Sequence, residues 1–152
     1  MKAVREILYK VNINKVIGDT GALIGNVVSD SREVIEKDLY IAINGVNVDG
    51  HKFINSAIKK GAICIVCEVL PNKLQEGILY VVVESTRESI GIISSNYFSN
   101  PSSKLKLIGI TGTNGKTTIA TLLYNLYKTA GLKAGLISTV INYIDGKEIG
   151  ST

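Results

Sequence analysis

The sequence contains no tryptophan, and aromatic residues make up only 6% of its 152 residues. Proteins that bind single-stranded nucleic acid stack bases on aromatic side chains, and this chain shows no recognisable stacking motif. Lysine and arginine give a net charge of +4, but they are spread along the chain without a dense block. We therefore expect no nucleic-acid partner and interpret the positive charge as a solvated surface.

Long apolar runs are also missing. None approaches the roughly 20 residues that a membrane-spanning helix needs, and the start of the chain lacks the basic, apolar and small-residue order of a signal peptide. No membrane span and a cytoplasmic location are expected.

Cysteine and histidine are scarce, with two and one copies. Cys64 and Cys67 have C-x-x-C spacing inside a β-branched run, where residues i and i+3 point to opposite faces of a strand. They cannot chelate one metal ion together, and we expect buried free thiols of a reducing compartment. His51 has no assigned catalytic partner, so a loop or helix-start role is expected for it.

A phosphate-binding loop stands out among the motifs that are present. Residues 106–130 read KLIGITGTNGKTTIATLLYNLYKTA, with a short apolar run suited to a buried strand at 107–110. The glycines Gly112 and Gly115 let backbone N–H groups turn toward an anion. Lys116 adds a charge for terminal phosphates, and Thr117 offers a hydroxyl to Mg²⁺. The motif predicts a nucleotide site.

The helix after this loop is predicted from its period. Six apolar residues recur at helical spacing and predict one buried face, and Gly131 suits the left-handed position at the helix end. The six are Ile119, Leu122, Leu123, Leu126, Tyr127 and Ala130.

Hydrophobic periodicity predicts further elements elsewhere. Helices are expected within 2–11, over 53–60 and over 85–98, the last opened by a capping box at Ser85. Pro101 and its small polar neighbours mark a boundary, giving domains 1–100 and 101–152. Strands are expected at 15–17, 26–28, 38–43, 62–67, 79–83 and 133–140, with a hairpin over 141–149 that turns at Asp145-Gly146. Alternation of strands and helices predicts an α/β fold.

A second polar cluster, Ser29-Asp30-Ser31-Arg32, follows the strand at 26–28, and a glycine-flanked loop over 45–51 follows the next strand. Two loops at strand ends can meet, and a hydroxyl with a guanidinium suits a diphosphate or a uracil edge. From the residues alone, a surface turn with an Asp–Arg ion pair explains the cluster better.

Taken together, VVSDSREVIEKDLYIAINGVNVDGHKFINSAIKKGA and IGITGTNGKTT resemble the Mur ligase family, MurE type, over the whole chain. The resemblance implies a Rossmann-like N-terminal UDP-substrate domain, followed by the start of a P-loop NTPase-type α/β central domain. It also implies an amide ligase of peptidoglycan synthesis, a process linked to cell shape and division.

The resemblance implies roles for individual residues. ATP would bind Gly112, Thr113, Asn114, Gly115, Lys116, Thr117 and Thr118, with Lys116 on the β and γ phosphates and Thr117 on Mg²⁺. The UDP end of the substrate would contact Ser31, with Ser29, Val46, Asn47 and Val48 near the nucleotide. This reverses the ion-pair interpretation of the Ser29–Arg32 cluster.

The reaction implied is transfer of the ATP γ-phosphate to a carboxylate of UDP-N-acetylmuramoyl-L-alanyl-D-glutamate, followed by attack of an amino acid, diaminopimelate or lysine. A further metal carboxylate, a carbamylated lysine and the amino-acid-selecting domain are expected beyond Thr152, so these 152 residues alone should be inactive.

Three alternatives stay open. They are a MurF-type ligase or folylpolyglutamate synthetase, an ATP-binding regulatory module that does not ligate, and a nucleic-acid-stimulated ATPase.

Overall fold

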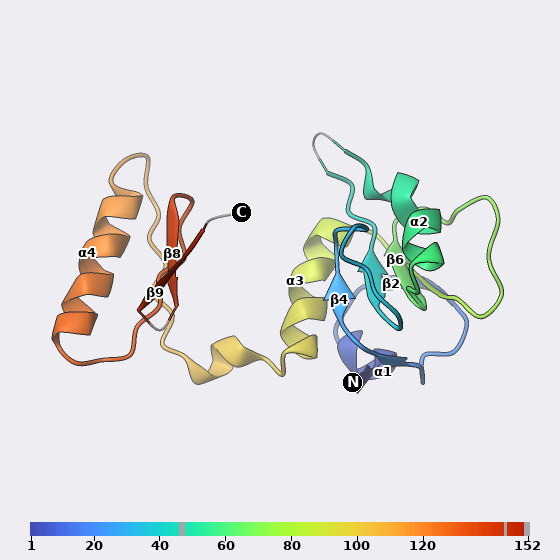
Figure 1. Cartoon of the computed structure of the whole chain (residues 1–152), viewed down its shortest axis with the longest axis horizontal. Helices are drawn as coiled ribbons and strands as arrows, with labels where there is room; N and C mark the ends of the chain where they lie inside the picture. Colours follow the sequence, from blue (N-terminus) through green and yellow to red (C-terminus); the bar gives the residue numbers. More distant parts are fainter. Residues whose placement is uncertain (46–47, 145, 151–152) are drawn as a thin grey trace. The chain divides into compact units, whose positions relative to one another are not determined.

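The structure, a computed structural model, describes residues 1–45, 48–144 and 146–150. It divides into two compact units, Met1–Leu105 and Lys106–Thr152 (Figure 1). The division follows the short 3-10 helix η2 (Pro101–Lys104), close to the expected boundary. Within the described ranges, no helix is long and apolar enough to cross a membrane.

The first unit is built on a five-stranded sheet with strand order β2-β7-β6-β5-β4. Four of its strands run parallel to one another: β4 (Val27–Val28), β5 (Leu39–Ile41), β6 (Cys64–Cys67) and β7 (Leu79–Val83). The fifth, β2 (Ile13–Ile17), pairs antiparallel with β7 at the edge of the sheet. The carboxyl ends of β4 to β7 therefore lie on one edge of the sheet, the edge at which ligands bind in open α/β folds.

Both faces of this sheet are covered, which explains why its strands are almost continuously apolar. On one face, Ile41, Cys64 and Val66 belong to a buried cluster that includes residues of α1 (Val4–Ile7) and α3 (Thr86–Tyr97). On the other face, Ile65 and Cys67 belong to a cluster with residues of α2 (Ile54–Lys59) (Figure 1). The two thiols are free and fully buried on opposite faces, as predicted.

The short helix expected within residues 2–11 is present with Val4 and Ile7 buried, but it covers only part of that range. Lys2–Ala3 forms strand β1, which pairs with β3 (Leu23–Ile24), and α1 spans only Val4–Ile7. The backbone leaves helical geometry soon after, since Lys10 has φ of 62°. Strand pairing of the first residues outweighs the helical period, which is a weak local preference.

Helix α3 follows its prediction closely. The Ser85 side chain accepts a hydrogen bond from the Glu88 amide at 3.2 Å, as an N-cap should. Ile93 is fully buried, and Ile90 and Tyr97 pack partly buried against the same cluster. In α2, Ile54 and Ala57 are buried as expected, but Phe53 is 40% exposed at the end of the 3-10 helix η1 (Gly50–Phe53).

The second unit consists of helix α4 (Lys116–Thr129) and a hairpin of β8 (Ile141–Ile144) and β9 (Lys147–Gly150). Ile144 pairs with Lys147, which confirms the hairpin; Asp145 lies outside the described residues. Tyr124 of α4 stacks on Tyr143 of β8 with ring centroids 5.0 Å apart. At the helix end, the Leu132 amide donates to the Tyr127 carbonyl at 2.9 Å, and Gly131 has φ of 77°, as predicted.

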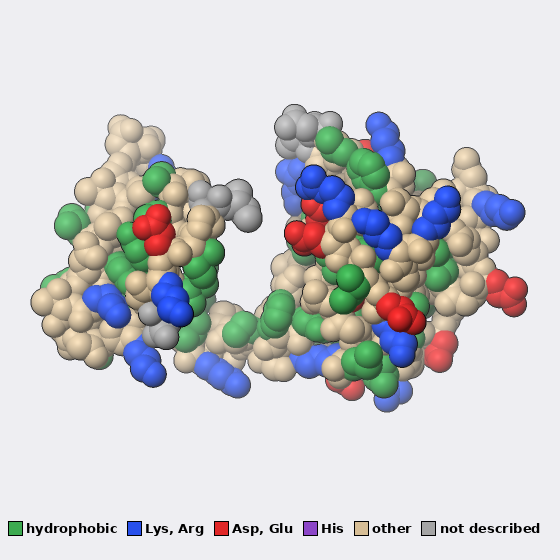
Figure 2. Space-filling model, in the orientation of Figure 1, with side chains coloured by type: hydrophobic (Ala, Val, Ile, Leu, Met, Phe, Trp, Pro, Cys, Tyr) green, Lys and Arg blue, Asp and Glu red, His purple; other side chains and the backbone are tan. Residues whose placement is uncertain are grey.

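Three predictions for the second unit are wrong. Residues 107–110 and 133–140 form no strand in the described chain, apart from one bridge between Leu136 and Tyr143. The predicted buried face of α4 is largely exposed: Leu122 is 62% and Leu126 is 63% accessible. Hydrophobic side chains are visible on the surface of this unit (Figure 2). A strand and an amphipathic face both need partner elements, and among the described hydrophobic residues of this unit only Tyr124 and Leu136 are buried.

Candidate nucleotide-binding site

The phosphate loop has the backbone geometry that its glycines predict. Gly112 has φ of 149° and Gly115 has φ of 77°, and a Cβ at Gly115 would be strained by this φ although no atom lies near it. Helix α4 starts directly at Lys116. Its first internal hydrogen bond is donated by the Ile119 amide to the Gly115 carbonyl at 2.9 Å. The N–H groups of the preceding residues therefore remain available for an anion.

Lys116 bends back over this loop. Its Nζ donates to the Gly112 carbonyl at 2.6 Å and to the Thr113 carbonyl at 3.3 Å. The ammonium group is thus held beside the loop and the helix N-terminus, where the backbone is most positive.

The loop is open to a ligand. Thr113, Asn114 and Thr118 are exposed, and Thr117 in the first turn of α4 is half-buried. The Thr117 hydroxyl remains the predicted oxygen ligand for Mg²⁺. No group of three or more His, Cys, Asp or Glu side chains in the described ranges could hold a metal ion. Mg²⁺ commonly takes several of its ligands from nucleotide phosphates and water, so a complete set of protein ligands is not required beside Thr117.

The second predicted site lies at the carboxyl edge of the sheet. Ser29 to Arg32 follow β4, and residues 42–51 follow β5, which is the neighbouring parallel strand. The pKa of Tyr40 is raised to about 12, mainly by burial and also by the carboxylates of Asp30 and Asp49. One carboxylate belongs to each segment, so both segments lie near the Tyr40 hydroxyl. Parallel pairing of β4 and β5 puts both segments at the same edge of the sheet, and their convergence on one ligand stays a prediction.

Within the first segment, Asp30 and Arg32 form an ion pair at 2.6 Å. The hydrogen bond from the Arg32 side chain is the largest cause of an Asp30 pKa lowered to about 2. The ion-pair interpretation is therefore correct as a description of the chain. Ser29 is exposed and Ser31 is half-buried at this edge, so both hydroxyls remain candidates for contacting a ligand.

The second segment is a narrow loop. The Gly50 amide donates to the Ile43 carbonyl at 2.8 Å, and the Gly45 amide donates to the Val48 carbonyl at 3.1 Å. Val48 is 56% exposed. The predicted contacts Val46 and Asn47 lie outside the described residues.

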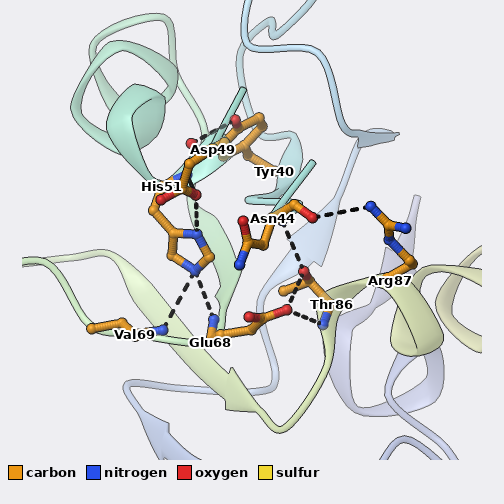
Figure 3. A network of polar contacts seen from close by, with 9 residues as sticks. Tyr40, Asn44, Asp49, His51, Glu68, Val69, Thr86 and Arg87 are labelled. Carbon is orange, nitrogen blue, oxygen red and sulfur yellow. Dashed lines mark hydrogen bonds and ion pairs between the residues drawn. The ribbon is translucent and has the colours of Figure 1, made fainter. Parts of the chain in front are cut away.

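A network of polar side chains joins this loop to the ends of β6 and β7 (Figure 3). The Glu68 carboxylate accepts hydrogen bonds from the amide and hydroxyl of Thr86, at 2.9 and 2.8 Å. These bonds lower the pKa of Glu68; the amide is the largest cause. His51 Nδ1 lies 2.6 Å from Asp49 Oδ1, and His51 Nε2 accepts from the Glu68 amide at 2.9 Å. His51 thus has the structural role that was expected.

Glu68, Thr86 and Arg87 were not identified from the sequence. Their contacts join residues 17 to 43 positions apart, which no local period reveals. One signal was available: Glu68 comes directly after β6 and Thr86 comes shortly after β7, so parallel pairing brings them to the same edge.

Comparison with known proteins agrees with this geometry. Residues 23–106 match the "Mur ligase family, catalytic domain" and residues 110–152 match the "Mur ligase middle domain". The chain is 48% identical over 145 residues to a UDP-N-acetylmuramoyl-L-alanyl-D-glutamate--2,6-diaminopimelate ligase of Bacteroides fragilis, and 45% identical over 144 residues to that of Phocaeicola vulgatus. In both comparisons 95% of this chain is covered, but it spans only 30% of the relative's length.

Solved structures of related ligases have a fold similar to that of this chain. A ligase of the same name superimposes with a TM-score of 0.70 at 23% identity, over 94% of this chain and 28% of that one. A MurF ligase from Thermotoga maritima in complex with ADP gives a TM-score of 0.53 at 32% identity, over 68% of this chain and 23% of that one. Since family matches cover most of both units, this chain belongs to the Mur ligase family.

Proposed function

We propose that this chain is part of an ATP-dependent ligase that adds the third amino acid, diaminopimelate, to UDP-N-acetylmuramoyl-L-alanyl-D-glutamate in peptidoglycan synthesis. Relatives named for this activity are 45% and 48% identical to it. The observation that carries the proposal is the phosphate loop, with two glycines at positive φ and the Lys116 ammonium beside the first turn of α4. A cytoplasmic location belongs to the proposal, because its substrates are cytoplasmic nucleotides.

In this proposal the second unit binds ATP. The backbone from Gly112 to Thr118 would surround the phosphates, and Lys116 would neutralise charge on the β and γ phosphates. Thr117 would contribute its hydroxyl to Mg²⁺. The ADP bound to the related MurF structure supports a nucleotide ligand for the family.

The first unit, in turn, would hold the UDP end of the acceptor at the carboxyl edge of its sheet. Ser29 and Ser31 on one side and Val48 on the other are the described candidates, with Val46 and Asn47 between the described flanks of the loop. Anchoring of the nucleotide would place the distant peptide carboxylate for attack on the ATP γ-phosphate, which is catalysis by positioning.

The test is binding of Mg²⁺-ATP to the 152-residue chain by calorimetry. Lys116→Ala should weaken binding by about a hundredfold, because a charge-assisted contact to phosphate is lost. Lys106→Ala, which removes a charge from the same unit outside the loop, is the matched control and should bind as the parent does. Equal binding by the folded Lys116→Ala variant and the parent would contradict the ATP site.

A further inference from the structure

The loop after β5, residues 43–51, is referred to below as the nucleotide loop. Its two described flanks lie against each other: Asn44 bridges to Asp49, and the Gly50 amide donates to the Ile43 carbonyl. These bonds fix one flank relative to the other. The Tyr40 hydroxyl on β5 donates to the Gly50 carbonyl at 3.0 Å, which ties one flank to the sheet (Figure 3). Two further contacts hold the loop at the ends of the neighbouring strands.

The first of these contacts is at Asn44. Its amide donates to Thr86 Oγ1 at 3.4 Å, and its carbonyl accepts from Arg87 Nη2 at 3.3 Å. Thr86 is fully buried at the first turn of α3. Because the Thr86 hydroxyl donates its only proton to Glu68, an oxygen lone pair is left for Asn44 (Figure 3). Glu68 therefore sets the orientation of the group that holds Asn44.

The second contact is at His51. Its Nε2 accepts from the backbone amide of Glu68, so Nδ1 carries the proton and donates it to Asp49. Asp49 Oδ1 also accepts from the His51 amide at 2.9 Å. Both ends of the nucleotide loop are thus tied to the same residue, one to the backbone of Glu68 and the other to its carboxylate through Thr86.

From this arrangement we propose that Glu68, Thr86 and His51 are positioning residues for recognition of the uridine nucleotide. They touch no ligand themselves; they hold Asn44 and His51, in the two described flanks of the nucleotide loop, against the ends of β6 and β7 in advance of binding. Preorganisation of a loop raises affinity because its ordering cost is met before the ligand arrives. The inference rests on the proposed UDP site.

The test uses UDP as the probe, titrated into the 152-residue chain by calorimetry. Thr86→Val keeps the shape of the side chain but removes the acceptor for Asn44, and UDP should bind about five- to tenfold more weakly. Thr86→Ser restores the hydroxyl and should recover most of the affinity. Ser85→Ala removes the neighbouring N-cap of α3, which lowers stability without touching the loop. It should leave UDP affinity within about twofold of the parent.

A second variant covers the case in which Thr86→Val does not fold. Arg87 is exposed, and Arg87→Gln removes the bond to the Asn44 carbonyl with little risk to the fold. We expect about two- to threefold weaker UDP binding. Lys59→Gln removes the same charge from α2 and is the control for loss of attraction to an anion; the effect at Arg87 should exceed it.

The outcomes separate the two proposals. If the parent chain does not bind UDP, the proposed UDP site is wrong and the positioning role is wrong with it. If the parent binds UDP, and folded Thr86→Val and Arg87→Gln bind it no worse than Ser85→Ala and Lys59→Gln, the positioning role alone is overturned. Selective loss in the first pair with recovery in Thr86→Ser supports it.

Discussion

Among single residues, Glu68 makes the contacts with the clearest energetic consequence. Its carboxylate accepts two hydrogen bonds from Thr86, and its pKa is lowered as a result. Nearby, the carboxylate of Asp49 raises this pKa. A carboxylate that folding makes more acidic stabilises the protein at any pH above its unfolded pKa, and this stabilisation is lost as the pH falls through the folded pKa.

At neutral pH we therefore expect the parent to have a larger free energy of unfolding than Glu68→Gln, and a higher melting temperature. The difference should be about 1 kcal/mol or less, because solvent screens a charge that is only partly buried. The difference should shrink as the pH falls below the ordinary pKa of a glutamate, and vanish once the parent carboxyl is neutral in the folded protein as well. Melting temperatures of both proteins across this range are the measurement. A difference that stayed constant with pH would show that the charge of Glu68 does not stabilise the fold.

Gly50, at the base of the nucleotide loop, gives a test at the scale of an element. A Cβ there would lie 2.8 Å from both the amide nitrogen and the carbonyl oxygen of Ile43, which are backbone atoms that cannot move aside. Gly50→Ala should therefore force the two flanks apart, destabilising the chain by about 1–3 kcal/mol. UDP binding should weaken more than ATP binding.

Gly91 provides the matched control, since it lies inside α3 and a methyl group added there would meet no atom within 4 Å. Gly91→Ala makes the same chemical change in an exposed helix and should raise stability by about 0.5–1 kcal/mol. The measurement is the free energy of unfolding of both variants and the parent, by denaturant titration. Two changes of the same sign would mean that crowding at Ile43 is not what makes Gly50 necessary.

The elements that the sequence predicts well carry their own evidence locally. Ser85 with its helix, the β7 run and the pairing of β8 with β9 each follow from neighbouring residues. The failures depend on distant partners. Residues 107–110 are apolar enough for a buried strand, but in the described chain nothing pairs with them, and Leu107 is 70% exposed. The network around Glu68 was missed for the same reason.

At the scale of the whole molecule, the two units differ in how completely they bury their apolar residues. The first has a core on both faces of its sheet, whereas in the second only Tyr124 and Leu136 are buried among the described hydrophobic residues. Exposed apolar side chains in the second unit include Leu107 and Ile108, together with Leu122 and Leu126. Exposed apolar surface favours association.

We expect the 152-residue chain to self-associate as its concentration rises, while residues 1–105 remain monomeric with a single unfolding transition. Sedimentation velocity over a concentration series is the measurement. Leu122→Gln with Leu126→Gln should reduce the association, and Val16→Gln with Ile35→Gln, two exposed positions in the first unit, should not. A monomeric 152-residue chain at every concentration would contradict this expectation.

The placement of Cys64 and Cys67 on opposite faces of β6 gives the first unit a pair of natural reporters. Burial raises the pKa of both thiols, to about 11 for Cys67, so neither reacts readily while its own layer is closed. Cys64 becomes accessible when the layer of α1 and α3 opens, and Cys67 when the layer of α2 opens. The order in which a thiol reagent labels them in the native protein would thus show which side of the sheet opens first, without the need to introduce a cysteine.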